Sequence, residues 1–169
     1  MHLRSIEIQG FKTFAKKTEL LFEPGITAVV GPNGSGKSNL VDAIRWVLGE
    51  RSARELRGTR MEEIVYSGGA RRPASGMAEV RLVIDNTDGR LPVPYQEVEV
   101  VRRGYRSGES EFFLNGSRCR LRDVEELLSS TGLTQEGYSV VAQDDVDHII
   151  QTSAAGRRAL IEEAAGVRG

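Results

Sequence analysis

The sequence predicts an α/β (α+β) fold in which a helix that follows a glycine-rich loop packs against β-structure. Three observations support this. A short apolar, β-branched run at residues 26–30 leads directly into the loop, and apolar residues recur at helical spacing over 37–48. Residues 77–121 then alternate between apolar and polar side chains, as antiparallel strands do. A length of 169 residues, with 39% hydrophobic and 28% charged residues, fits one soluble domain with its own core.

Three strands are predicted up to the glycine-rich loop. Residues 3–11 alternate, which places Ile6 and Ile8 on one face. Residues 14–22 are compatible with a second strand. Residues 26–30 are apolar throughout, and we therefore expect a strand that is buried on both faces.

A helix is predicted directly after the glycine-rich loop. It covers residues 37–48, with apolar side chains at 40, 41, 44, 47 and 48, and Gly49 suits its C-terminal end. Residues 58–76 are rich in Gly, Arg, Ser and Pro, which indicates mostly loop with one helical turn around 61–65.

The next stretch is predicted to be an antiparallel meander. Strands are expected at 77–85, 97–104 and 110–114, and Asn115-Gly116 is a strong hairpin signal leading into 117–121. We expect Trp46 and the pair Phe112-Phe113 to be core residues. The remaining elements are predicted to be a helix at 122–130, a strand at 138–142 and a helix at 153–164.

Composition limits the classes of function. The formal net charge is −1, so any nucleic-acid site must come from local clustering of charge. Such clustering exists, since residues 100–122 hold six arginines against two glutamates, whereas 123–169 are strongly acidic. The lone Cys119 excludes an internal disulfide framework and a cysteine metal cluster. The N-terminus lacks a signal-peptide pattern, and no run approaches the roughly 20 apolar residues of a membrane span. We therefore expect a cytoplasmic protein.

The glycine-rich loop carries the clearest chemistry. Gly31, Gly36, Lys37 and Ser38 match the phosphate-binding pattern G-x-x-x-x-G-K-[ST]. Glycines let successive main-chain N–H groups surround an anion, and the following helix offers its positive N-terminal end to the same phosphates. In this pattern the lysine binds the β- and γ-phosphates, and the serine hydroxyl is a ligand of Mg²⁺. The sequence therefore predicts a P-loop that binds ATP with Mg²⁺.

Hydrolysis needs further groups, among them a carboxylate close to the metal. The best candidate for a Walker B strand is 82–85, but it alternates faces, lies in the β-rich stretch and is followed by Asn86. No convincing Walker B strand is present, so the chain alone is not expected to be a complete catalyst.

Beyond the P-loop, the sequence closely resembles the N-terminal half of the ATPase head of bacterial SMC (structural maintenance of chromosomes) proteins. The matching segments are distributed along the whole chain: 10–14, 29–39, 43–50, 52–58, 112–116, Gln143 ahead of 147–150, and 157–166. SMC motifs usually have a glycine after the glutamine, whereas this chain has Asp144-Asp145.

The resemblance implies a split head of the ABC-ATPase type, with a mixed core sheet and an antiparallel β-subdomain at about 77–121. Residues 1–169 would form its N-terminal lobe, with the P-loop at 31–38, a Q-loop at 143 and the root of a coiled coil from about 153. The C-terminal lobe, which follows the coiled coil and hinge, would bring Walker B and the signature motif. Implied partners are that lobe, a second SMC protomer, kleisin-type accessory subunits and double-stranded DNA. The implied role is chromosome condensation and segregation at the nucleoid.

The family also implies roles for single residues. Lys37 and Arg57 would act on the phosphates, Arg57 in the manner of an arginine finger, and Gln143 would reach Mg²⁺ and the attacking water. Ser38 would hold the metal. Other residues implied to lie at the nucleotide are Gly31, Pro32, Asn33, Gly34, Ser35, Gly36, Asn39, Lys12 and Thr13. Arg60, Arg120 and Arg122 fall where related heads carry basic residues that face DNA, a contact insensitive to base sequence.

Other functions compete with this interpretation. A Rad50/RecN-like DNA-repair ATPase head has a similar loop, but residues 45–50 and Arg57-Gly58 favour SMC. A small-molecule P-loop kinase would continue with alternating β and α units, whereas a β-meander follows here. A non-catalytic, nucleotide-gated interaction module is the third alternative, and it fits the isolated chain.

Overall fold

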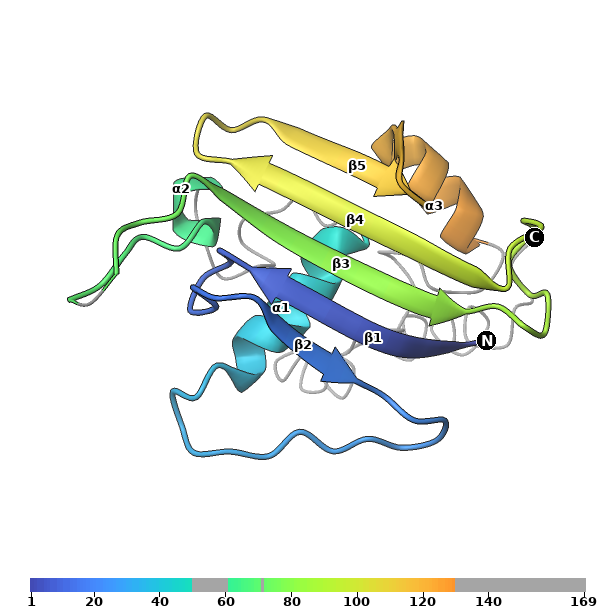
Figure 1. Cartoon of the computed structure of the whole chain (residues 1–169), viewed down its shortest axis with the longest axis horizontal. Coiled ribbons are helices and arrows are strands. Elements are labelled where there is room, and N and C mark those ends of the chain that lie inside the picture. The colour runs from blue at the N-terminus through green and yellow to red at the C-terminus, as the bar shows by residue number, and fades with distance from the viewer. Residues whose placement is uncertain (50–60, 71, 130–169) are drawn as a thin grey trace, which may run out of the picture.

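The computed structural model describes residues 1–49, 61–70 and 72–129. These residues build one six-stranded sheet with helices α1 and α3 packed on the same face (Figure 1). The sheet order is β2-β1-β3-β4-β5-β6, and every pair is antiparallel. The strands are β1 His2–Gln9, β2 Thr18–Leu21, β3 Met77–Asp85, β4 Glu97–Tyr105, β5 Ser110–Leu114 and β6 Ser117–Cys119, and the helices are α1 Lys37–Val47, α2 Met61–Ile64 and α3 Leu121–Ser129.

The antiparallel meander is confirmed, but the sheet is larger than the range 77–121. β1 pairs with β3 over almost its whole length, from His2 opposite Asp85 to Gln9 opposite Glu79. The N-terminal strands therefore extend the same sheet, rather than joining a second, mixed sheet. No parallel pair occurs among the described residues, and the expected strand at 138–142 lies outside them.

The hairpin between β5 and β6 turns at Asn115-Gly116, as predicted. Both residues have positive φ, 43° for Asn115 and 80° for Gly116, which is the requirement of a type I′ turn. The Asn115 side chain also accepts a hydrogen bond from the Glu99 amide at 2.6 Å. The turn residue thereby ties the hairpin to the end of β4.

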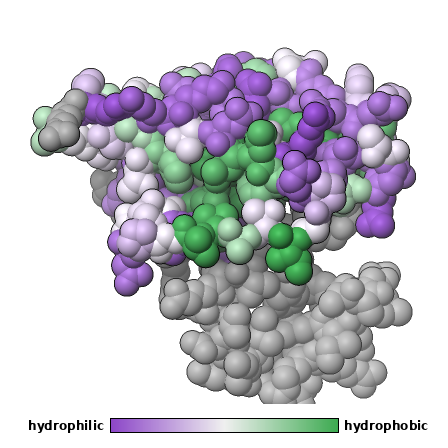
Figure 2. Space-filling model, turned by 60° about the horizontal axis from the view of Figure 1, so that its bottom comes forward, coloured by the Kyte–Doolittle hydropathy of each residue, from purple (hydrophilic) through white to green (hydrophobic). Residues whose placement is uncertain are grey.

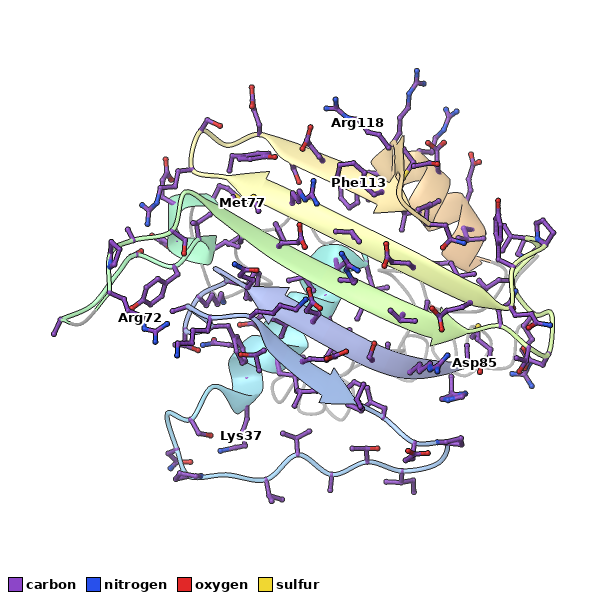
Figure 3. All side chains as sticks on the ribbon, in the orientation of Figure 1. Lys37, Arg72, Met77, Asp85, Phe113 and Arg118 are labelled. Carbon is purple, nitrogen blue, oxygen red and sulfur yellow. The ribbon has the colours of Figure 1, made fainter. Side chains whose placement is uncertain are left out.

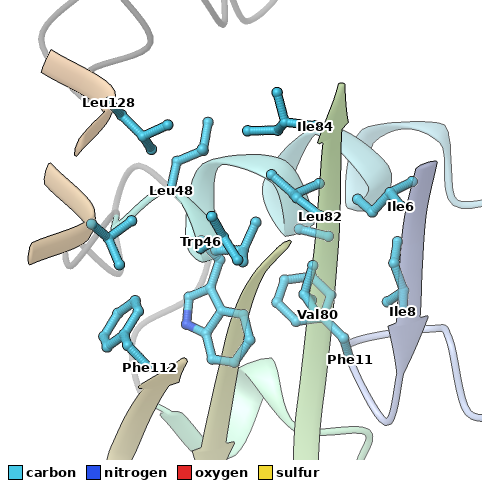
Figure 4. Packing of buried hydrophobic residues seen from close by; sticks show 14 of the residues in the cluster. Ile6, Ile8, Phe11, Trp46, Leu48, Val80, Leu82, Ile84, Phe112 and Leu128 are labelled. Carbon is cyan, nitrogen blue, oxygen red and sulfur yellow. The ribbon is translucent and has the colours of Figure 1, made fainter. Parts of the chain in front are cut away.

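The core lies between the sheet and the two helices. The inward residues of β3, Ala78, Val80, Leu82 and Ile84, are at most 3% exposed, and Ile6 and Ile8 of β1 are fully buried. Trp46 of α1 stands in the middle of this cluster, with its ring centroid 5.3 Å from that of Phe11 (Figure 4). Alternation along the strands and helical spacing along α1 thus place their apolar residues in one continuous core.

Arg102 fastens the C-terminal end of α1 to the sheet. This arginine is buried, and its guanidinium lies 4.6 Å from the ring centroid of Trp46 and 4.8 Å from that of Phe112. Its Nη1 donates a 2.6 Å hydrogen bond to the main-chain carbonyl of Trp46, and Nε donates one to Ser110. A cation at the negative end of a helix, stacked on aromatic faces, is stabilised by both effects.

The opposite face of the sheet carries charged side chains in cross-strand pairs. Arg81 pairs with Glu99 at 3.0 Å, and Arg103 with Glu79. Phe113 lies on this face under the Arg103 guanidinium, at 4.8 Å (Figure 3). The prediction that Phe113 is a core residue was therefore wrong, because alternation along β5 sends it to the face opposite Phe112.

The expected buried strand at 26–30 is also wrong for the described residues. No strand is assigned there, and Ile26, Val29 and Val30 are exposed by 102%, 47% and 87%. A strand that is apolar on both faces needs pairing partners and covering layers, and none of the described residues supplies them. Figure 2 shows exposed hydrophobic residues on the side of the molecule that carries this segment.

Candidate functional site

The P-loop passes into α1 through two glycines in left-handed backbone conformations. Gly34 has φ of 80° and Gly36 of 98°, and Gly36 is the N-cap residue of α1. No side chain caps the first turn of this eleven-residue helix, so its N-terminal N–H groups lack the usual side-chain acceptor. The first turn of α1 is thus built to receive an anion.

Two glycines of the loop are also required for close packing. A Cβ atom on Gly31 would lie 2.9 Å from the Ser35 hydroxyl oxygen, and one on Gly36 would lie 3.2 Å from the Thr13 hydroxyl oxygen. Larger residues at these positions would fill the space around the loop. The structure therefore explains the glycines at the first and sixth positions of the motif.

Lys37 folds back over the loop. Its ammonium donates hydrogen bonds to the main-chain carbonyls of Gly31 at 2.6 Å and Pro32 at 2.8 Å. The charge is thereby held within the concave side of the loop. Ser38, the next residue, is exposed at the same end of α1, where its hydroxyl is available to a metal ion.

The loop after β1 packs against α1. Thr13 accepts a 2.9 Å hydrogen bond from the Asn39 side chain, so the predicted neighbours of the nucleotide at 13 and 39 are brought together. Lys12 instead pairs with Asp42 at 2.7 Å.

Asp42 was missed by the sequence analysis. The apolar positions at 41 and 44 suggested a different buried face of α1, whereas the buried residues are Leu40, Asp42, Ala43, Trp46 and Val47. The spacing of Ala43, Trp46 and Val47 is the signal that would have identified this face.

The remaining predicted site residues are placed as follows. Pro32, Asn33 and Ser35 are exposed on the loop. Arg57, Arg60 and Gln143 lie outside the described residues. Asp85, the end of the rejected Walker B candidate, lies well away from Lys37 (Figure 3). Within the described ranges no group of three or more His, Cys, Asp or Glu side chains is arranged to hold a metal ion.

Most arginines of the basic stretch are committed to other contacts. Arg102 is buried, Arg106 donates to the carbonyls of Ser75 and Tyr66, and Arg118 pairs with Glu111 at 2.9 Å. Arg120 and Arg122 are exposed where α3 begins, Arg122 at 3.5 Å from Glu126. The local positive charge seen in the sequence is thus largely used within the fold.

Shifted pKa values occur away from the P-loop. Hydrogen bonds from the Thr87 hydroxyl and amide lower the pKa of Asp85. A hydrogen bond to Glu111 raises the pKa of Tyr105, and burial raises the pKa of the Cys119 thiol. These groups stabilise loops and strand ends, and none of them adjoins Lys37.

Comparison with known proteins identifies the family. The RecF/RecN/SMC N-terminal domain family matches residues 2–141. A solved structure from work on ATP-driven dimerization and DNA-stimulated activation of SMC ATPases superposes with a TM-score of 0.90 at 36% identity, covering 97% of this chain and 99% of that one. The chain belongs to the SMC family. Its fold is that of the N-terminal part of an SMC ATPase head.

Further relatives agree. The chromosome partition protein Smc of Mycolicibacterium paratuberculosis is 54% identical over 167 residues, which are 99% of this chain but 14% of that protein. An Smc head bound to the C-winged helix domain of ScpA gives a TM-score of 0.94 at 36% identity, covering 99% of this chain and 52% of that one. The chain thus spans about one seventh of its curated relative. The similarity favours SMC over the kinase and over other DNA-repair heads.

Proposed function

We propose that this SMC chain is the nucleotide-binding lobe of a chromosome-partition ATPase. It binds ATP with Mg²⁺ at residues 31–38, and a separate C-terminal lobe supplies Walker B and the signature motif. Two such heads then enclose ATP between them. Hydrolysis belongs to the assembled head, and the chain alone turns over little.

The observation that carries this proposal is the geometry at the start of α1. Left-handed glycines, an uncapped helix N-terminus and an ammonium held against the loop carbonyls form a set of donors that fits a triphosphate. Lys37 would exchange its two carbonyl acceptors for the β- and γ-phosphate oxygens, which are stronger, charged acceptors. The Ser38 hydroxyl would hold Mg²⁺.

Other residues would complete the site. Asn33, Asn39 and Thr13 would hold the loop around the phosphates. Arg57 would offset the negative charge that develops on the γ-phosphoryl group, and Gln143 would orient water and reach Mg²⁺. Bound ATP would supply the phosphoryl group that is transferred to water.

The exposed segment at 26–30 supports the need for a separate lobe. It is apolar and β-branched, and leads into the P-loop, yet it is exposed. Strands of a C-terminal lobe would pair with it and bury it, which would also fix the entry to the P-loop. The rest of the catalytic machinery would arrive with those strands.

An ATPase assay with and without the C-terminal lobe added in trans tests the split head. We expect little turnover by the chain alone and recovery when the lobe is present. In the reassembled head, Lys37→Ala should weaken binding of an ATP analogue by about 10- to 100-fold, the range of a lost charge-assisted hydrogen bond. Robust hydrolysis by residues 1–169 alone would contradict the proposal and favour a kinase-like enzyme.

DNA contact is proposed at Arg120 and Arg122, with Arg60 as a third contributor. The two described arginines project near the N-terminus of α3. Their charge suits contacts with phosphates of any base sequence, as a chromosome-wide function requires.

Charge reversal tests this surface. Arg120→Glu with Arg122→Glu should weaken DNA binding by the ATP-engaged head and reduce its dependence on salt. Arg90→Glu with Arg118→Glu is a matched control, because these side chains are 70% and 71% exposed, like Arg122 at 71%. Equal losses in the two double variants would indicate a general charge effect, and an unchanged affinity and salt slope would remove the site.

Partners are proposed from the relatives. The solved SMC structures concern ATP-driven dimerization and a head bound to ScpA. By analogy, this chain takes part in an ATP-dependent head dimer and assembles with a kleisin-type subunit. Among the described residues, no helix combines the length and apolar character needed for a bilayer span.

A further inference from the structure

Lys12 and Asp42 form the most deeply buried ion pair among those described. The Lys12 ammonium lies 2.7 Å from the Asp42 carboxylate, and the two side chains are 11% and 4% exposed. The pair joins the loop after β1 to α1. Charged groups are rarely buried to this extent, since desolvation opposes it, so their placement calls for a specific role.

The main chain around Lys12 is held in an unusual conformation. Lys12 has φ of 46°, a left-handed value that non-glycine residues seldom adopt. Its amide donates a 2.6 Å hydrogen bond to the carbonyl of Ile64, which fixes the turn to the end of α2. The lysine is thus delivered to α1 by a turn that the surrounding structure maintains.

The same turn contacts α1 at three successive levels. Thr13 packs against Gly36, receives the hydrogen bond of Asn39, and is preceded by Lys12 on Asp42. Positions 36, 39 and 42 are spaced by three residues and share one side of the helix. The loop after β1 therefore lies along the helix that carries the proposed phosphate site.

Asp42 places a negative charge close to that site. It follows the N-cap Gly36 by six residues, or about 9 Å along the axis of an α-helix. Without a countercharge, Coulomb repulsion across that distance, at the intermediate dielectric typical of such sites, would weaken binding about 20-fold for each negative charge on the ligand. A triphosphate would bind poorly beside an unpaired Asp42.

We infer that Lys12 is a positioning residue that neutralises Asp42 and holds the turn at 10–14 against α1, rather than a ligand of the phosphates. This inference rests on the proposed ATP site. It assigns the pair a role in nucleotide affinity, and it gives Lys12 a different task from the direct contact that the family resemblance implies.

A double-mutant cycle in the full-length protein tests the inference. The measurement is the Kd of a non-hydrolysable ATP analogue, accompanied by the melting temperature without nucleotide. Lys12→Met should weaken binding at least about 10-fold, and the loss should shrink as salt is added, because screening reduces the repulsion. Lys12→Met with Asp42→Asn, which removes both charges, should restore the Kd to within about 3-fold of the wild type.

The alternatives give different results. If Lys12 contacts the phosphates directly, the double variant stays as weak as Lys12→Met, and that outcome overturns the inference. Normal binding by Lys12→Met overturns it too. If the single variant does not fold, the double variant decides alone, since it lacks the ammonium altogether.

Two controls separate this inference from the proposed function. Lys17→Met removes an exposed lysine that pairs with Glu7, and it should leave the Kd unchanged. Lys37→Ala should abolish most binding. If Lys37→Ala binds the analogue normally, the ATP site itself is wrong, whatever the Lys12 variants do.

Discussion

Replacing Gly104 with alanine should destabilise the fold by a predictable amount. An added Cβ atom would lie 2.7 Å from Cζ2 and 3.2 Å from Cη2 of the Trp46 ring, and 3.0 Å from the Met61 sulfur. Carbon atoms in contact normally stay about 3.5 to 4.0 Å apart. Trp46 is fully buried and is held by Phe11 and Arg102, so it has little room to move away.

The expected cost follows from these distances. Overpacking of this kind costs about 1 to 3 kcal/mol. Loss of the glycine's freedom in the unfolded chain returns about 0.4 to 1 kcal/mol. The net destabilisation is therefore about 1 to 2 kcal/mol, which lowers the melting temperature by roughly 2 to 8 °C for a chain of this size.

Trp46 provides the assay. It is the single tryptophan of the chain, and its fluorescence reports exposure of the core during unfolding by denaturant. Gly76→Ala is the matched control, because a Cβ atom there meets nothing within 4 Å and its φ is not in the positive range. Coincident unfolding midpoints for Gly104→Ala and Gly76→Ala would refute the packing described around Trp46.

Three further predictions concern other parts of the sheet. Asn86→Ala removes three hydrogen bonds from a buried amide, among them the one accepted from Leu91, and should cost about 2 to 3 kcal/mol; a wild-type melting curve would contradict this. Because Thr87 lowers the pKa of Asp85, its stabilising effect is present above the unfolded pKa of about 3.9 and is lost as the pH falls through the folded value. Asp85→Asn should therefore reduce the melting temperature at pH 7 but have little effect near pH 2, and an equal reduction at both would exclude the linkage. Burial raises the pKa of Cys119, so iodoacetamide should modify it more slowly in the folded chain than in the unfolded chain at pH 8, with equal rates counting against the described packing.

Local sequence patterns were sufficient to predict most of the sheet. Alternation defined β3 at Met77–Asp85, and Asn115-Gly116 located a hairpin whose φ values fit a type I′ turn. These features depend on neighbours within a few residues. The P-loop was equally accessible, because its glycines and lysine act within eight consecutive positions.

Features that depend on distant partners were harder to predict. Residues 26–30 have the composition of a buried strand, but burial requires pairing partners that the described residues do not provide. The Lys12–Asp42 contact joins residues 30 positions apart, and neither side chain announces it in the sequence. The placement of Phe113 was an avoidable error, because alternation along β5 already separates it from Phe112.

The attachment of α1 at both ends has a mechanical consequence. Arg102 holds the carbonyl of Trp46 at one end, and Asn39 and Lys12 tie the other end to the turn that follows β1. Helix and sheet must therefore shift together as one rigid body. Adjustment to an arriving ligand would then be concentrated in the segment between β2 and α1, where Gly25 and Gly34 have the backbone freedom of a hinge.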